Sequence, residues 1–203
     1  MSSVAKRQHF NKLAPQWDQL PHPEDAWPKV EEFVGRAWRT NPTLVLDAGC
    51  GTGILLPYVL KASPPVRRVV ELDFAEGMLR ENARKVGDPR VARLCADAHT
   101  LPFLDACFDL VLCFGVLPHL ADLPAALAGL WRVLRPSGVL TVGHLMSSTE
   151  LNAFHQSMGE PVARDHLPPA ESLAQMLRQL EGTVVAAEDK PGWYFVEVQK
   201  APV

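Results

Sequence analysis

The segment 44–53, LVLDAGCGTG, constrains the fold of this chain more than any other. A short run of branched apolar residues is typical of a parallel strand that is covered on both faces. The run ends at Asp47, and Gly49, Gly51 and Gly53 then permit positive φ angles and close backbone approach to a ligand. The pattern predicts a buried strand, a nucleotide-cradling loop and a helix start. Such loops also serve nicotinamide and flavin enzymes, so the pattern alone does not identify the ligand.

Strands and helices alternate through the rest of the chain. Apolar runs predict further strands at 66–73, 90–96, 108–114 and 139–144, and helical spacing predicts helices at 54–61, 74–86 and 123–134, with a turn at 135–138. Later, 150–158 and 170–180 are expected to be helices, and 183–189 and 193–200 strands joined by a hairpin-type connection. We therefore predict an α/β fold with a Rossmann-like, doubly wound, mostly parallel seven-stranded sheet and one antiparallel strand near the C-terminus.

The length of 203 residues favours one domain, 1–203. Residues 1–40 are expected to form an N-terminal arm, interrupted at Pro15, and a cap helix at 24–38. Residues 41–145 form the predicted ligand-binding core, 146–182 a substrate or lid region, and 183–203 the C-terminal strands.

Charge and cysteine content exclude several classes of protein. The net charge of −3 and the scattered Lys and Arg residues disfavour a nucleic-acid partner. Neither a signal peptide nor a membrane-spanning apolar stretch is evident. The four cysteines lack C-x-x-C spacing, which indicates reduced thiols packed as small apolar groups. We expect a cytoplasmic monomer or homodimer.

Carboxylates follow the first three predicted strands, at Asp47, Asp73 and Asp97. Asp73 lies about one nucleotide unit beyond the glycine loop, where a carboxylate accepts hydrogen bonds from both ribose hydroxyls. Glu71, two residues earlier, points the same way in this interpretation and shares that task. Asp97 is placed to accept a hydrogen bond from an adenine amine. These acids therefore predict a nucleoside site at the carboxyl edge of the sheet.

Three acids at one site disfavour a dinucleotide, because they would repel its pyrophosphate. S-adenosylmethionine has ribose, adenine, a sulfonium and an ammonium, so it suits them better. A short-chain dehydrogenase needs Tyr-x-x-x-Lys, but Tyr58 is followed four residues on by Ala62, and Tyr194 by Val198. The sequence therefore disfavours a dehydrogenase.

Five motifs occur in order: LDAGCGTG at 46–53, DFAEGML at 73–79, DAHTLPF at 97–103, FDLV at 108–111 and LRPSG at 134–138. Together they resemble the successive motifs of class I S-adenosylmethionine-dependent methyltransferases. Within that class the chain is most similar to the ubiquinone and menaquinone biosynthesis-like group of small-molecule enzymes. The segment 10–18, FNKLAPQWD, resembles that group's arm, which folds over the cofactor.

The resemblance implies roles for residues at matching positions. Backbone groups of the glycine loop approach the methionine moiety, and Asp47 helps to orient its ammonium. Phe74 and Met78 flank the adenine, the Ala98 amide contacts its edge, and the backbone near Phe114 borders the sulfonium. The implied cofactor-binding residues are Trp17, Asp47, Gly49, Cys50, Gly51, Asp73, Phe74, Met78, Asp97, Ala98 and Phe114.

The chain lacks motifs that are typical of DNA methyltransferases, and this limits the class of methyl acceptor. The segment 113–120, CFGVLPHL, lacks the Asn/Asp-Pro-Pro-aromatic signature of enzymes that methylate exocyclic amines of DNA bases. No Pro-Cys dipeptide supplies the nucleophile of cytosine-C5 enzymes. Ser137 stands where the family often has glycine, which affects only a turn. A small-molecule acceptor is therefore expected.

Histidines are the candidate catalytic residues. The predicted order of elements places four at the active edge, with Asp165 and Met146 nearby: His119, His144, His155 and His166. In one interpretation His119 borders the pocket and the others are structural. In the other, His144 and His155, with His119, bind the acceptor, act as base or coordinate a soft metal or metalloid substrate. No H-x-x-x-H spacing predicts a metal site.

The sequence therefore predicts an S-adenosylmethionine-dependent methyltransferase acting on an O, S, N, C or metalloid centre of a small molecule. His144, His119 and His155 are the candidate catalytic residues, and no metal is expected. The alternative is a cofactor-binding but catalytically silent module that regulates or scaffolds a partner. The intact acids and glycines favour activity. Trp17, Trp193 and Phe154 either line the pocket or belong to the core.

Overall fold

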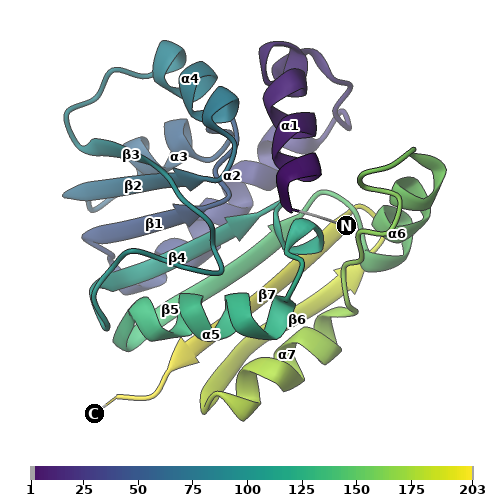
Figure 1. Ribbon diagram of the computed structural model, residues 1–203. Coiled ribbons are helices and arrows are strands. Elements are labelled where there is room, and N and C mark those ends of the chain that lie inside the picture. Colours follow the sequence, from purple (N-terminus) through teal and green to yellow (C-terminus); the bar gives the residue numbers. More distant parts are fainter. Residues whose placement is uncertain (1–2, 203) are drawn as a thin grey trace.

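A computed structural model describes residues 3–202 and contains a seven-stranded sheet with helices on both faces (Figure 1). The strand order is β3-β2-β1-β4-β5-β7-β6. Strands β1 to β5 pair in parallel, and β7 is antiparallel to both β5 and β6. The predicted mostly parallel sheet with one reversed strand is confirmed. The strands are β1 (Leu44–Ala48), β2 (Arg68–Asp73), β3 (Val91–Cys95), β4 (Phe108–Phe114), β5 (Leu134–His144), β6 (Gly182–Lys190) and β7 (Trp193–Lys200).

Two apolar cores hold helices against the two faces of the sheet. Leu130 and Leu173 belong to the core under α5 and α7, and Phe33 and Val59 to the core under α2 and α3. Because the central strands are covered on both sides, β1 and β4 are almost entirely apolar. The helices are α1 (Ser3–Leu13), α2 (Ala26–Ala37), α3 (Leu56–Lys61), α4 (Glu76–Lys85), α5 (Leu123–Val133), α6 (Ser148–Ser157) and α7 (Ala170–Gln179), with 3₁₀ turns η1 (Ala14–Gln19), η2 (Trp38–Thr40) and η3 (Leu117–His119).

The segment 135–138 differs from the prediction, because it lies within β5 rather than before it. The register with β4 shifts from Phe108 opposite Leu134 to Leu110 opposite Val139, so the intervening residues form an irregular bulge. Ser137 adopts a φ of 61°, the left-handed conformation for which glycine is usually preferred. The predicted turn is therefore wrong, since its residues form a bulge inside a strand that has already begun.

The N-terminal arm, α1 and η1, lies beside α4 over the carboxyl edge of the sheet (Figure 1). The Oδ1 atom of Asn11 accepts a hydrogen bond of 2.7 Å from the amide of Gly77 at the start of α4. Phe10 packs with Met78, and with Val162 from the loop that joins α6 to α7. This loop and the arm together roof the edge where the predicted site residues gather.

Candidate active site

A cavity lies at the carboxyl ends of the parallel strands. It has two adjoining parts, one lined by Asp97, Ala98 and His99 and the other by Phe10, Trp17 and Met78. The two spaces share the lining residues Gly49, Asp73, Phe74, Val116 and His119. The predicted edge of the sheet is therefore hollow where its motifs converge.

The glycine loop is pressed against its neighbours. Its Gly49 has a φ of 78°, and a Cβ atom there would lie 2.2 Å from Cγ2 of Val116. The amides of Gly49 and Cys50 donate to the Leu72 carbonyl at 2.7 and 3.0 Å. Only glycine fits at position 49, because both the φ angle and the contact with Val116 exclude a side chain.

Asp73 lines both parts of the cavity and holds the loop in shape. Its Oδ2 accepts a hydrogen bond of 2.9 Å from the Gly51 amide, and its Oδ1 one of 2.8 Å from the Ala75 amide. Burial raises the pKa of Asp73, and these amide hydrogen bonds oppose that rise. Each carboxylate oxygen has a second lone pair, so Asp73 keeps the capacity to accept from ribose hydroxyls.

Asp47 is buried, and neither of its carboxylate oxygens has a hydrogen-bond partner among the described residues. Burial raises its pKa well above the usual value, and the nearby charges of Glu71 and Asp73 raise it further. A positively charged ligand group would offset both effects. Asp47 does not line either part of the cavity, so its contact with the ammonium of S-adenosylmethionine stays a prediction.

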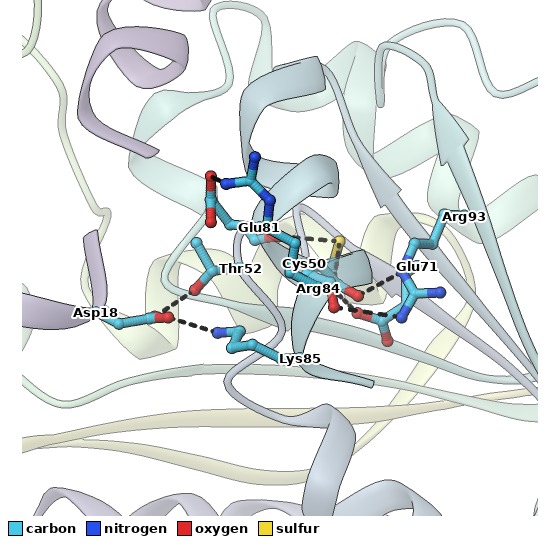
Figure 2. A network of polar contacts seen from close by, with 10 residues as sticks. Asp18, Cys50, Thr52, Glu71, Glu81, Arg84, Lys85 and Arg93 are labelled. Carbon is cyan, nitrogen blue, oxygen red and sulfur yellow. Dashed lines mark hydrogen bonds and ion pairs between the residues drawn. The ribbon is translucent and has the colours of Figure 1, made fainter. Parts of the chain in front are cut away.

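Glu71 does not line the cavity, whereas the sequence interpretation gives it a share in binding the ribose. Its Oε2 accepts a hydrogen bond of 2.7 Å from Asn82, whose Oδ1 accepts one of 2.6 Å from Arg93 (Figure 2). The carboxylate is fully buried, which raises its pKa to about 7 despite the Asn82 hydrogen bond. The helix α4 supplies Asn82, so Glu71 supports the fold beneath the loop rather than lining the cavity.

The thiol of Cys50 belongs to the same network as Glu71. It lies 3.9 Å from Asn82 Nδ2 and is buried, and the residue is not among those that line the cavity. Burial raises the pKa of this thiol well above its usual value, so it stays protonated. Only the backbone of Cys50 takes part in the shape of the glycine loop.

A pair of residues after β3 forms the other wall. Asp97 Oδ1 accepts hydrogen bonds from the His99 amide at 2.9 Å and from its Nδ1 at 2.6 Å. The Asp122 amide donates to His99 Nε2 at 3.2 Å, so the proton is assigned to Nδ1. Asp97, Ala98 and His99 all line the cavity. The sequence analysis assigns no role to His99, which is part of the motif DAHTLPF. Its position two residues after Asp97 could have indicated a hydrogen bond between the two side chains.

Aromatic and sulfur side chains complete the wall on the arm side. Trp17, Phe74 and Met78, which the sequence analysis places among the cofactor-binding residues, line the cavity. The ring of Phe114 instead packs on Phe33, with ring centroids 4.8 Å apart, and Gly115 is the residue there that lines the cavity. The backbone after β4, rather than the Phe114 side chain, therefore borders the space.

His119 lines both parts of the cavity and contacts three other elements. Its Nδ1 lies 2.6 Å from Oδ2 of Asp165. Asp165 Oδ1 also accepts from Lys6, which donates to the His119 carbonyl at 3.2 Å. The His155 Nδ1 lies 3.2 Å from the Asp165 carbonyl oxygen, and its ring lies 5.3 Å from that of His119. No sequence pattern indicates a role for Lys6, which is 159 residues from its partner Asp165.

His144 lies behind this group. The Met146 amide donates to its Nδ1 at 3.1 Å, which leaves the proton on Nε2. Burial, with the nearby His119 and His155, lowers the pKa of His144 to about 3. It is therefore neutral near pH 7, and its Nε2 is a donor rather than a base.

The remaining candidates lie away from the cavity lining. The indole of Trp193 stacks on Phe195 within the core, and Phe154 and His166 are exposed. Among residues 3–202 no group of three or more His, Cys, Asp or Glu side chains is arranged to hold a metal ion. Within the same range no helix is long and apolar enough to span a membrane.

Comparison with known proteins identifies the family. Residues 46–142 match the family described as "Methyltransferase domain". The chain is 31% identical over 200 residues to a demethylmenaquinone methyltransferase of Roseiflexus sp. (strain RS-1), covering 83% of this chain and 81% of the relative. It is 35% identical over 137 residues to a malonyl-[acyl-carrier protein] O-methyltransferase of Xylella fastidiosa (strain M23), covering 66% of this chain and 45% of the relative. For several of these relatives the match spans about half of their length.

Solved structures share the fold. The cyclase SpnF superposes with a TM-score of 0.78 at 18% identity, covering 100% of this chain and 97% of the other. The N-methyltransferase NodS of Bradyrhizobium japonicum WM9, solved with S-adenosylhomocysteine, gives 0.75 at 15% identity, covering 97% and 98%. At such identities the likeness concerns the fold alone. The match to the methyltransferase domain family and the 31% identity to the Roseiflexus enzyme establish that the chain belongs to the S-adenosylmethionine-dependent methyltransferases.

Proposed function

We propose that this protein transfers a methyl group from S-adenosylmethionine to a small-molecule acceptor inside the cavity. The observation that carries the proposal is the convergence on one cavity of a glycine loop, Asp73 and Asp97, and a histidine. The named relatives act on different acceptors, so they support the reaction type without naming the acceptor of this chain.

The lining residues divide the work of holding the cofactor. Asp73 accepts from the ribose hydroxyls, and Asp97 with the Ala98 amide contacts the adenine edge, in the position fixed by His99. We assign Asp47 to the ammonium, because its buried carboxyl group has no hydrogen-bond partner in the described chain and lies just before the glycine loop in the sequence. When bound, the cofactor supplies an electrophilic methyl group on a sulfonium.

Three histidines have distinct roles in this proposal. His119 is the base, since its imidazole lines the cavity and its Nε2 makes no hydrogen bond to a described residue. His155 holds the loop that carries Asp165, and His144 fixes the backbone at Met146. Proximity inside a closed site contributes on the order of 7–11 kcal/mol to such a displacement.

Cysteine content and net charge support a proposal for the compartment and the kind of partner. Four free thiols, at Cys50, Cys95, Cys107 and Cys113, suit a reducing compartment such as the cytoplasm. The net charge of −3 supports a diffusible small molecule rather than a nucleic acid as partner. We propose that the protein works there as a monomer or homodimer.

Two measurements test the proposal. Isothermal titration compares S-adenosylhomocysteine with NAD, and we expect micromolar-range binding, about −8 kcal/mol, for the former only. Methyl transfer from labelled S-adenosylmethionine is then screened by mass spectrometry against thiols, phenols, quinols and metalloids. Binding of NAD alone would contradict the family assignment of the cavity. Binding of S-adenosylhomocysteine without transfer to any acceptor would favour the silent module instead.

A further inference from the structure

We propose that Asp165 is a positioning residue that orients His119 as the base, and that Lys6 of the N-terminal arm holds Asp165 in place. The base would then be aligned only while the arm covers the cavity. This inference rests on the proposed function, because it specifies how the acceptor loses its proton.

The geometry of Asp165 is fully specified by three elements. Its Oδ1 accepts from Lys6 in α1, its Oδ2 contacts Nδ1 of His119 in η3, and its carbonyl oxygen contacts His155 in α6. Its own amide donates to the Val162 carbonyl at 2.9 Å. The Asp165 side chain is 4% exposed, so it is a buried charge whose partners are all provided by the fold.

This geometry fixes the tautomer of His119. A carboxylate accepts hydrogen bonds and donates none, so the 2.6 Å contact places the proton of His119 on Nδ1. The lone pair then lies on Nε2, the nitrogen without a partner in the described chain. Burial raises the pKa of Asp165, but the hydrogen bonds from His119 and Lys6 outweigh that and hold it below its usual value. Asp165 is therefore an anion that stabilises a protonated His119.

The neighbouring histidines do not compete for the proton. Burial and the proximity of His119 lower the pKa values of His9, His144 and His155. The charged groups that face His119 are Asp165 and Lys6, with Asp73 close enough that His119 opposes the rise in its pKa. Of the two carboxyl groups, Asp165 is the one in contact with the His119 ring.

The charges of the lining also limit the acceptor. Asp73 and Asp97 both contribute carboxyl groups to the lining, and the one ammonium among the described lining residues, that of Lys6, is engaged by Asp165. An anionic acceptor such as a carboxylate would meet no unpaired cation among the described lining residues. A neutral acceptor with an ionisable proton, such as a hydroxyl, phenol or thiol, suits the site better.

The step balances with this acceptor class. His119 Nε2 takes the proton of the acceptor O–H or S–H bond, and the freed electron pair forms the new bond to the methyl carbon. The carbon–sulfur bond breaks, and its electron pair stays on sulfur, which gives S-adenosylhomocysteine. The proton remains on His119 beside Asp165 until solvent removes it after release.

The test compares Asp165→Asn with a matched control, Asp18→Asn. Asp18 also accepts from a lysine and a polar side chain, Lys85 and Thr52, but does not contact His119. We expect Asp165→Asn to lower kcat about 10²-fold or more, with the dissociation constant of S-adenosylhomocysteine within about threefold of wild type. The defect should shrink as pH rises toward ionisation of the acceptor identified in the screen, because an ionised acceptor needs no base. Asp165→Glu, which restores the carboxylate, should recover part of the activity.

A second readout needs no acceptor. The ¹⁵N shifts of the His119 imidazole should indicate the Nδ1–H tautomer in wild type and Asp18→Asn, and loss of that preference in Asp165→Asn. Retention of the Nδ1–H tautomer in a folded Asp165→Asn, or equal kcat losses in the two variants, would overturn the inference. If no acceptor is methylated, the proposed function fails while the ¹⁵N measurement still decides whether Asp165 orients His119. If Asp165→Asn does not fold, the same measurement on Lys6→Met decides, and an unchanged tautomer population there overturns the role of Lys6.

Discussion

Two carboxylates fasten the N-terminal arm, one at each end. Asp18, at the end of η1, accepts from Thr52 Oγ1 at 2.6 Å and Lys85 Nζ at 2.7 Å, which ties the arm to the glycine loop and α4 (Figure 2). Asp165, outside the arm, accepts from Lys6 and His119, which ties α1 to the roof loop and η3. Each carboxylate thus joins a lysine and one other polar side chain.

The two sites differ in exposure. The Asp18 side chain is 53% exposed and that of Asp165 only 4%. Exposed ion pairs are screened by solvent and contribute about 0–1 kcal/mol, whereas removing one partner of a buried pair costs about 3–5 kcal/mol. The two lysine–carboxylate contacts therefore differ in how much stability each contributes, although their geometry is similar. In the proposed function, Asp18 fastens the arm weakly on the cofactor side, and Asp165 fixes the orientation of His119 on the acceptor side.

The largest effect is expected at His119 itself. His119→Gln keeps a polar side chain of similar size but removes the base, so turnover should fall about 10²- to 10⁴-fold. Affinity for S-adenosylhomocysteine should stay near wild type, because the residues that hold the cofactor are unchanged. Steady-state kinetics and isothermal titration provide the two numbers. Wild-type turnover in His119→Gln would show that His119 is not the base. The Asp165 end of the arm would then have no catalytic role that the Asp18 end lacks.

The next effect concerns the cofactor side. Asp73→Ala removes the acceptor for two ribose hydroxyls and should weaken S-adenosylhomocysteine binding by about 1.5–3 kcal/mol, on the order of ten- to a hundredfold. Glu71→Gln is the matched control, since Glu71 is buried two residues earlier but does not line the cavity. If Glu71→Gln weakened binding and Asp73→Ala did not, the ribose would have been assigned to the wrong acid. Thermal melting checks that both variants fold.

A smaller effect follows from the neutral state of His144. Its pKa is about 3 in the folded chain, against the ordinary value of 6.5 in the unfolded chain, so the unfolded chain binds more protons between these values. The stability that neutral His144 contributes is complete above pH 6.5 and is lost as pH falls toward 3. At pH 5.5 the loss should be about 1.4 kcal/mol. Urea unfolding of wild type and His144→Gln at pH 7.5 and 5.5 measures it, and equal pH dependence of the two proteins would contradict the assignment.

The smallest effect is expected at the exposed carboxylate. Asp18→Asn should lower stability by less than about 1 kcal/mol and change S-adenosylhomocysteine affinity only a few fold, because the Lys85 pair is solvent-screened. The change should shrink further at high salt. Titration at two ionic strengths measures it. A loss as large as that of Asp73→Ala would mean that Asp18 does more than fasten the arm.

The parts of the site that the sequence predicted share one property: they are local in the chain. Gly49 directly follows β1, Asp73 is the last residue of β2 and Asp97 lies two residues after β3. Parallel strands bring these carboxyl ends to one edge. Pattern and turn chemistry therefore sufficed. Glu71 was misplaced because alternation along a strand does not reveal that α4 supplies Asn82 to bind it.

The parts that the sequence did not predict depend on distant contacts. Lys6 and Asp165 are 159 residues apart, and His119 and Asp165 are 46 apart, with no periodic pattern linking them. The sequence pattern places Asp165 near the histidines but does not indicate that it binds His119. No pattern points to Lys6. The packing of the roof loop on the arm, through contacts such as Phe10 with Val162, brings them together. Such packing is a tertiary property that no local motif encodes.

The most direct test of this account is an NMR measurement on the complex with S-adenosylmethionine carrying a ¹³C-labelled methyl group. If His119 faces the reacting methyl group, the methyl protons should give a nuclear Overhauser effect to the ring protons of His119, which lines the cavity. The ¹⁵N shifts of His119 in the same sample should indicate the Nδ1–H tautomer. A saturated complex without a methyl-to-His119 effect would contradict the claim that the base fixed by Asp165 faces the reacting group.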